Sequence, residues 1–137
     1  MITATAARAA IVLAMVATSA YAAPRELLDA IRHVETGGER NGGRDAVGDN
    51  GRSIGPYQIG RAYWLDSRVP GSWDACRDTT YAERVMAAYW ARYCPAALSA
   101  NDMETLARVH NGGPSGHRKQ GTVTYWRKVK AALRKRG

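Results

Sequence analysis

Residues 24–36 have the pattern of a short amphipathic helix, and this segment constrains the fold most. Four apolar side chains recur at helical spacing on one face: Leu27, Leu28, Ile31 and Val34. Pro24 is favoured in a first helical turn, and Gly37-Gly38 ends the helix. Glu35 lies four positions beyond Ile31, so it falls on the face that the fold must bury. Burial removes water from a carboxylate and raises its pKa, so Glu35 can stay protonated near neutral pH.

A second carboxylate follows in a glycine-rich, polar stretch. Asp49 precedes Asn50-Gly51, a strong turn signal, and we expect its side chain to stay ionised there. Cleavage of a glycosidic bond needs two carboxyl groups in unlike environments, one as the acid and one as nucleophile or electrostatic partner. The alternative is structural: Glu35 pairs with Arg32 or Arg40, and Asp49 only shapes a turn.

Residues 1–22 have the pattern of a secretory signal peptide. Arg8 supplies a positive charge, and a short uncharged apolar run leads to the small-x-small motif Ala20-Tyr21-Ala22. An uncleaved N-terminal anchor is the alternative, although the run is short for a bilayer. We therefore predict cleavage near Ala22, a secreted or periplasmic location, and one domain over residues 23–137.

The remaining chain is basic. Lys and Arg number 20 against 12 Asp and Glu, and the signal segment holds one of them, Arg8, so the net charge becomes +7. This charge suits anionic surfaces such as cell-wall polymers, and we interpret the basic residues 127–136 as a solvated helix face. The sequence has no zinc, haem, iron–sulfur, P-loop or dinucleotide motif. We therefore predict no metal or cofactor, no specific nucleic acid and no membrane span.

The two cysteines, Cys76 and Cys94, favour a disulfide because export leads to an oxidising compartment. They flank an expected helix, so a loop at one end would have to fold back over it. Further helices are expected over residues 61–67, 79–93, 101–110 and from Thr122 or Thr124 onward, with Asn101 and Glu104 as a capping box. Residues 37–52 are expected to form a loop with one small hairpin, and residues 53–59 an extended or irregular segment.

Seven short motifs occur in an order that resembles the invertebrate-type lysozymes, the destabilase family. They are Val34-Glu35-Thr36-Gly37, Asp49-Asn50-Gly51, residues 53–59 (Ser-Ile-Gly-Pro-Tyr-Gln-Ile), residues 63–66 (Tyr-Trp-Leu-Asp), residues 92–95 (Arg-Tyr-Cys-Pro), residues 107–114 (Ala-Arg-Val-His-Asn-Gly-Gly-Pro) and Tyr125-Trp126. The resemblance implies a lysozyme-like α+β fold, mostly helical, with a small β-hairpin beside the helix that carries Glu35. It also implies hydrolysis of β-1,4 bonds between N-acetylmuramic acid and N-acetylglucosamine in peptidoglycan, or binding of chitin-like oligosaccharide.

The resemblance also implies roles for individual residues. Glu35 matches the general acid, and Asp49 matches the second carboxylate with a one-residue gap, which leaves Asp45 as the alternative. Retention of configuration is expected, with the carboxyls roughly 5 Å apart. Substrate-binding positions are expected at Ser53, Tyr57, Gln58, Tyr63, Trp64, His110 and Asn111. A core role for the aromatic residues and a capping role for His110 are the alternatives.

The chain departs from the family pattern in two ways. It has few cysteines, so we expect stability to come from an aromatic core: Tyr63, Trp64, Trp73, Tyr89, Trp90 and Trp126. Some relatives cleave isopeptide bonds with a serine and a lysine. Ser53 matches the serine, but Gly60 stands at the lysine position, so we predict little or no such activity.

Two other functions remain open from the sequence. A lytic transglycosylase would use Glu35 alone as the acid and leave a 1,6-anhydro end on its product. A cationic wall-binding antimicrobial protein would use only the net charge of +7.

Overall fold

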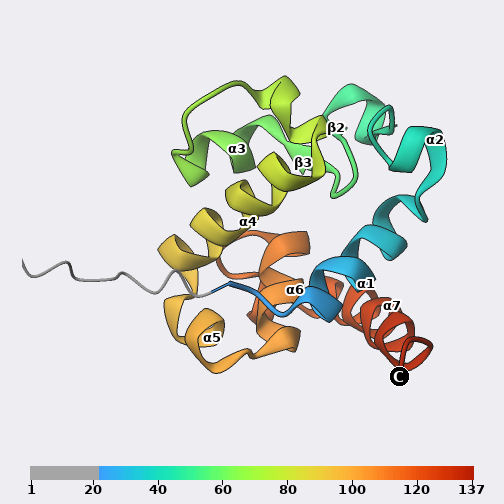
Figure 1. Cartoon of the computed structure of the whole chain (residues 1–137). Helices are drawn as coiled ribbons and strands as arrows, with labels where there is room; N and C mark the ends of the chain where they lie inside the picture. The colour runs from blue at the N-terminus through green and yellow to red at the C-terminus, as the bar shows by residue number, and fades with distance from the viewer. Residues whose placement is uncertain (1–21) are drawn as a thin grey trace, which may run out of the picture.

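The computed structural model describes residues 22–137 (Figure 1). Residues 1–21 of the predicted signal peptide therefore lie outside the described residues. The described part contains seven α-helices: α1 (Arg25–Thr36), α2 (Glu39–Gly42), α3 (Arg61–Ser67), α4 (Thr79–Tyr93), α5 (Pro95–Ala100), α6 (Met103–Gly112) and α7 (Val123–Arg134). None of the helices found between residues 22 and 137 is long and apolar enough to cross a membrane.

A small antiparallel sheet lies between α2 and α3 in the chain. Its strands are β1 (Val47–Gly48), β2 (Ser53–Ile54) and β3 (Ile59–Gly60), with β2 in the middle. The turn η1 (Asp49–Gly51) joins β1 to β2, and Asn50-Gly51 takes left-handed backbone there. The predicted small hairpin is present, but its second strand lies at residues 53–54, beyond the predicted range 37–52. The second hairpin, β2–β3, places Ser53 directly opposite Gly60.

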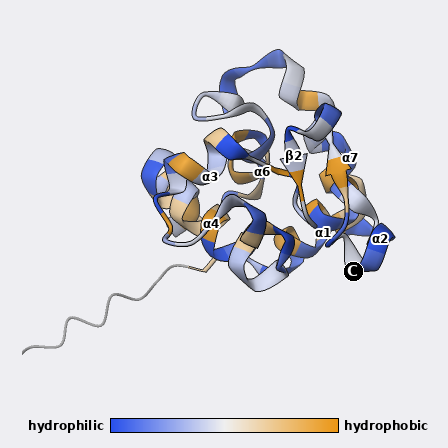
Figure 2. Cartoon of the chain, turned by 90° about the horizontal axis from the view of Figure 1, so that it is seen from above, coloured by the Kyte–Doolittle hydropathy of each residue, from blue (hydrophilic) through white to orange (hydrophobic). Residues whose placement is uncertain are grey.

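The core lies where α1, α4, α6 and α7 meet. α1 packs against α7 and α6, and α4 packs against α3 and α6 (Figure 1). The fully buried side chains of the core include Leu27, Ile31, Trp90 and Leu106. Burial of each such side chain contributes about 1.5–3 kcal/mol to the free energy of unfolding. The Trp90 indole N–H donates to the Leu106 carbonyl at 3.0 Å. Figure 2 shows the outer helix α2 as hydrophilic, in contrast to hydrophobic β2.

The sequence predicted most helices correctly and one junction wrongly. The helices over residues 61–67 and 79–93 are confirmed as α3 and α4, and α1 ends at Gly37, whose φ is 61°. The expected N-cap, Asn101, instead ends α5 in left-handed backbone. Asp102 caps α6, because its carboxylate accepts from the Thr105 N–H at 3.1 Å. Two helices were not predicted. The short helix α2 lies within the expected loop over residues 37–52, and α5 has Pro95 in its first turn, where Pro95 was expected only to end α4.

The predicted disulfide between Cys76 and Cys94 is not formed, and the prediction is wrong for this structure. Both cysteines are buried and unpaired. Cys76 precedes α4 and Cys94 follows it, and a helix of 15 residues is about 22 Å long. The helix α4 therefore lies between the two cysteines in the chain, and both remain unpaired.

The residues of the expected aromatic core differ in how deeply they are buried. Trp90 and Tyr89 are buried within it. The other four residues are partly buried and pack against its outside: Tyr63, Trp64, Trp73 and Trp126. Aromatic packing therefore extends from the centre of the core to its edge.

Candidate active site

Glu35 is held at the end of α1 with most of its side chain out of water. The side chain is 19% exposed. Burial raises the pKa of Glu35 to about 7, and the negative charge of Asp49 adds to this rise. The hydrogen bond from Tyr125 and the charge of Lys128 oppose it. Glu35 is therefore partly protonated at neutral pH, as its place on the apolar face of the helix predicted.

Tyr125 of α7 fixes one oxygen of this carboxyl group. The Tyr125 hydroxyl donates to Glu35 Oε1 at 2.9 Å. Burial raises the pKa of Tyr125 well above its usual value, so the hydroxyl keeps its proton. Because Oε1 accepts this hydrogen bond, Oε2 is the oxygen that is free to carry the acidic proton.

His110 of α6 lies beside the same oxygen as a neutral ring. Its Nε2 is 3.7 Å from Glu35 Oε1 and 3.1 Å from the Tyr57 carbonyl, while Nδ1 is 3.2 Å from the Tyr63 hydroxyl. A carbonyl only accepts, so Nε2 carries the proton and Nδ1 accepts from Tyr63. Burial lowers the pKa of His110 to about 4. At neutral pH the His110–Glu35 contact is therefore not an ion pair.

Asp49 reaches the site from the turn between β1 and β2. The Ser53 hydroxyl donates to Asp49 Oδ2 at 3.2 Å and also lies 3.1 Å from Gln58 Oε1. The Gln58 amide N–H donates to the Gly55 carbonyl at 2.9 Å, which turns its oxygen toward Ser53. Asp49 and Gln58 both have left-handed backbone, with φ of 50° and 52°. Such strained non-glycine residues cluster at functional sites.

Gly48 makes room for this arrangement. A Cβ atom at residue 48 would collide with Gln58 Oε1 and approach the Ser53 hydroxyl to 3.0 Å. The polar contacts among Asp49, Ser53 and Gln58 therefore require a residue without a side chain on the adjoining strand.

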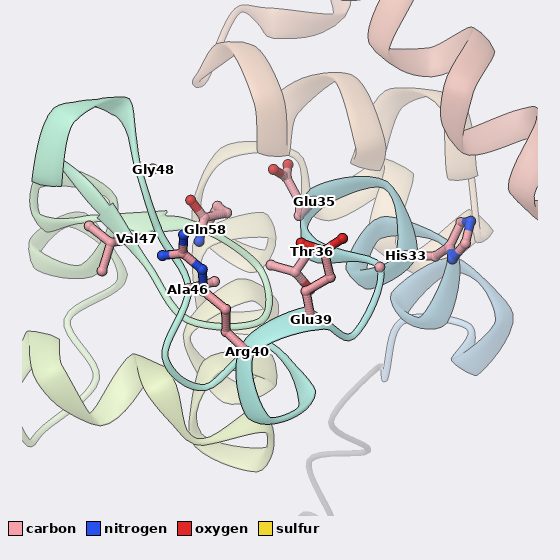
Figure 3. Close-up of a pocket in the computed structure, with 10 residues that line it drawn as sticks. His33, Glu35, Thr36, Glu39, Arg40, Ala46, Val47, Gly48 and Gln58 are labelled. Carbon is pink, nitrogen blue, oxygen red and sulfur yellow. The ribbon is translucent and has the colours of Figure 1, made fainter.

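The two carboxylates line one cavity of about 190 Å³. Its other lining residues are Gly48, Ser53, Gln58, His110 and Asn111. A second pocket, of about 530 Å³, shares Glu35, Gly48 and Gln58 with it and continues toward α2 (Figure 3). Asp45, the alternative second carboxylate, is exposed and does not line this cavity. The structure thus brings Glu35 together with Asp49.

Three expected substrate-binding residues lie elsewhere. Tyr57 is fully buried, and its hydroxyl donates to Glu83 at 2.6 Å. Tyr63 stacks on Tyr89 with ring centroids 3.7 Å apart. The Trp64 indole N–H donates to the Tyr81 hydroxyl at 2.9 Å. None of Tyr57, Tyr63 and Trp64 lines the cavity that holds Glu35 and Asp49. Tyr57 and Tyr63 contribute indirectly, because they orient His110.

Sequence reasoning identified Tyr125 as part of a family motif and missed its contact with Glu35. The two residues are 90 positions apart, and only the packing of α7 against α1 brings them together. The one available signal was a tyrosine on an otherwise apolar helix face, because a buried hydroxyl needs a partner. Between residues 22 and 137, no three His, Cys, Asp or Glu side chains form a group that could hold a metal ion.

Comparison with known proteins places this geometry in a family. Residues 26–132 match the family model described as Destabilase. Lysozyme 1 of Crassostrea virginica is 44% identical over 84 residues, which are 60% of this chain and 46% of that protein. The lysozyme of Ostrea edulis is 41% identical over 85 residues, 59% of this chain and 62% of that protein. The chain therefore spans about half to three fifths of the length of these curated relatives.

Solved structures agree with the sequence comparison. The inhibitor-bound lysozyme from Meretrix lusoria has a TM-score of 0.67 and 33% identity, covering 80% of this chain and 90% of that chain. The Tapes japonica lysozyme has a TM-score of 0.67 and 29% identity, covering 79% and 89%. The mostly helical fold with a small antiparallel sheet is thus a lysozyme fold. Together with the family match over residues 26–132, this shows that the chain belongs to the Destabilase family, which includes the invertebrate-type lysozymes.

Proposed function

We propose that the protein is a lysozyme that hydrolyses the β-1,4 bond between N-acetylmuramic acid and N-acetylglucosamine in peptidoglycan. The observation that carries this proposal is a carboxyl group with a pKa of about 7 that faces an exposed carboxylate across one cavity. The names of the relatives support the same reaction class. The net charge of +7 without the signal segment favours approach to an anionic wall, and we propose that the protein acts outside the cytoplasm.

In the proposed first step, Glu35 transfers the proton on Oε2 to the glycosidic oxygen while the bond from that oxygen to C1 breaks. The bonding electron pair leaves with the protonated oxygen. Asp49 stabilises the positive charge that develops at C1, or bonds to C1 from the opposite side. Glu35, now ionised, then removes a proton from a water molecule whose oxygen bonds to C1. Where Asp49 has bonded to C1, that bond breaks in this step and its electron pair returns to the Asp49 carboxylate. Covalent bonding by Asp49 gives retained configuration.

The residues around Glu35 and Asp49 favour different roles for the two carboxyl groups. The apolar contacts of α1 keep water from Glu35, and the donation from Tyr125 holds Oε1 in place. Ser53 orients Asp49 through the hydrogen bond to Oδ2. His110 is neutral, so it does not draw the proton from Glu35 by forming an ion pair. Hydrogen-bonded neighbours that lock the reacting side chains are what precise positioning requires.

Mass spectrometry of fragments released from purified peptidoglycan tests the proposal. The wild-type protein should release fragments with reducing N-acetylmuramic acid ends. Glu35→Gln should lower their release by at least about 100-fold, because it removes the general acid, with the fold unchanged by circular dichroism. Undiminished lysis by Glu35→Gln would favour a cationic antimicrobial protein. Products with 1,6-anhydro ends, still formed by Asp49→Ala, would favour a lytic transglycosylase.

We also propose that the protein has little or no isopeptidase activity through a serine–lysine pair. Gly60, which stands where the family's lysine would be, is the cross-strand partner of Ser53 and supplies no amine. The Ser53 hydroxyl is engaged with Asp49 and Gln58. A γ-glutamyl-lysine substrate should therefore remain uncleaved. Turnover of this substrate that is abolished by Ser53→Ala would refute the proposal.

A further inference from the structure

The larger pocket adjoins the acid and is lined by the polar loop that follows α1. It shares Glu35, Gly48 and Gln58 with the smaller cavity, and Arg40, Glu39 and Ala46 are among its other lining residues. Its volume of about 530 Å³ lies in the range of pockets that bind small-molecule ligands. The pocket adjoins Glu35, so it is placed to receive part of a polysaccharide that binds across this residue.

Arg40 lies in the short segment α2, whose strained backbone is held in place by a hydrogen bond and by close packing. Arg40 and Asn41 both have left-handed backbone, with φ of 48° and 60°. Non-glycine residues keep such a backbone conformation only where the surrounding structure imposes it. The Asp45 N–H donates to the Arg40 carbonyl at 3.1 Å. Gly43 is buried so close to Pro56 and Thr36 that a Cβ would approach their atoms to 2.8 and 2.9 Å.

The Arg40 guanidinium is uncommitted, although acidic groups are near it in the chain. Among residues 22–137 it forms neither an ion pair nor a hydrogen bond, in contrast to Arg25, which binds Glu83 through two nitrogens at 2.7 and 2.8 Å. In Figure 3 the Arg40 side chain points toward the side of the pocket that Ala46 and Gln58 line, and Glu39 lies on the Thr36 side. The pocket thus offers a free cation beside the expected path of the glycan.

A planar guanidinium is suited to a carboxylate, which it can bind through two parallel hydrogen bonds. The sugar rings of the peptidoglycan backbone carry no charge. The peptides attached to its muramyl residues carry carboxylates. Chitin-like glycan has no such group. Of the substrates considered for this cleft, only the peptide-bearing one therefore supplies the anion that Arg40 lacks.

We propose that this pocket binds a muramyl residue of the substrate together with its peptide, and that Arg40 pairs with a peptide carboxylate. Arg40 is then a specificity-determining residue that favours peptide-bearing peptidoglycan over uncharged glycan. This inference rests on the proposed function and adds the substrate group that the pocket recognises.

The test compares two forms of one purified peptidoglycan, one with free carboxylates and one whose carboxylates are converted to methylamides. Arg40→Gln should lower kcat/KM on the free-carboxylate wall about fivefold, the effect of a partly exposed charge pair, and leave kcat/KM on the amidated wall unchanged. Wild-type protein should prefer the free-carboxylate wall by a similar factor. Arg84→Gln, which removes an exposed charge on α4, should behave as wild type on both walls.

Binding by inactive protein provides a second measurement. Sedimentation with the same two walls gives the dissociation constant of Glu35→Gln alone and in combination with Arg40→Gln or Arg84→Gln. Weaker binding confined to the Arg40 variant and the free-carboxylate wall supports the proposal. Equal losses on both walls, or no loss on either, overturn it while leaving the muramidase proposal intact. Absence of turnover by wild type on either wall would instead refute the proposed function, and binding would still decide the role of Arg40.

Discussion

At the scale of single residues, burial raises the pKa of Glu35, and the hydrogen bond from Tyr125 opposes this rise. A donor to the carboxylate stabilises its ionised form, so this contact holds the pKa of Glu35 below the value that burial alone would give. Activity that needs protonated Glu35 should decline as pH rises through about 7. Tyr125→Phe removes the donor and should move this decline to higher pH by about one to two units, since a hydrogen bond to a charged group is worth about 1.5–3 kcal/mol.

The pH dependence of kcat/KM on soluble peptidoglycan fragments measures this shift. Tyr93→Phe is a matched control, because Tyr93 contacts Tyr89 edge-on and is not among the residues bonded to Glu35. A profile for Tyr125→Phe that coincides with wild type would show that the hydroxyl has no influence on the acid. A uniform loss of activity at every pH would point to packing alone.

At the scale of elements, the helix α4 keeps the two cysteines apart. Burial raises the pKa of Cys76 to about 12 and that of Cys94 to about 11, so both thiols stay protonated and inert at pH 8 in the folded protein. The purified, unreduced protein should therefore react with a thiol reagent only after denaturation, and then at both cysteines. A reductant should leave Tm unchanged. A protein mass 2 Da lower, with no reactive thiol after denaturation, would establish the disulfide instead.

The elements also show what local sequence can and cannot predict. Gly37, Asn50-Gly51 and the apolar period of α1 are local signals, and each produced the expected element. The start of α6 was misplaced by one residue, because Asn101 and Asp102 are both good caps. Asn101 takes the left-handed backbone that ends α5, so Asp102 caps α6. The two-residue strands β2 and β3 pair across a tight turn, which gives too short a pattern to recognise in advance.

The candidate site divides in the same way. Glu35 was placed by helical spacing, and Asp49 by its turn and by family resemblance. The contacts of Tyr125 with Glu35, and of His110 with Tyr57 and Tyr63, join separate elements and depend on tertiary packing. Conversely, Tyr57 and Trp64 have polar groups that suit a sugar, but these groups bind Glu83 and Tyr81. Residue type alone does not tell which partner a side chain takes.

At the scale of the whole molecule, the buried acid costs stability at high pH. The folded protein holds a proton on Glu35 up to about pH 7, whereas an unfolded chain releases it near 4.5. The proton is therefore bound more tightly by the folded state, so stability is complete below 4.5 and falls as pH rises through 7. Glu35→Gln removes this loss and should raise the free energy of unfolding at pH 8 by on the order of 3 kcal/mol.

Denaturant unfolding at pH 4 and pH 8 measures this effect. The gain from Glu35→Gln should be larger at pH 8 than at pH 4, where the wild-type carboxyl is already neutral. Glu26→Gln, at an exposed position in the first turn of the same helix, is the matched control for replacing a glutamate of α1 by glutamine. An equal effect of Glu35→Gln at both pH values would mean that the carboxyl group titrates normally in the folded protein.

Titration of the Glu35 carboxyl carbon by NMR tests the central claim most directly, because it observes the acid without substrate. The geometry predicts a pKa of about 7 in the wild-type protein. Asp49→Asn should give a lower pKa, because it removes the negative charge that faces Glu35. A wild-type pKa near 4.5, unchanged by Asp49→Asn, would contradict the assignment of Glu35 and Asp49 as a working pair.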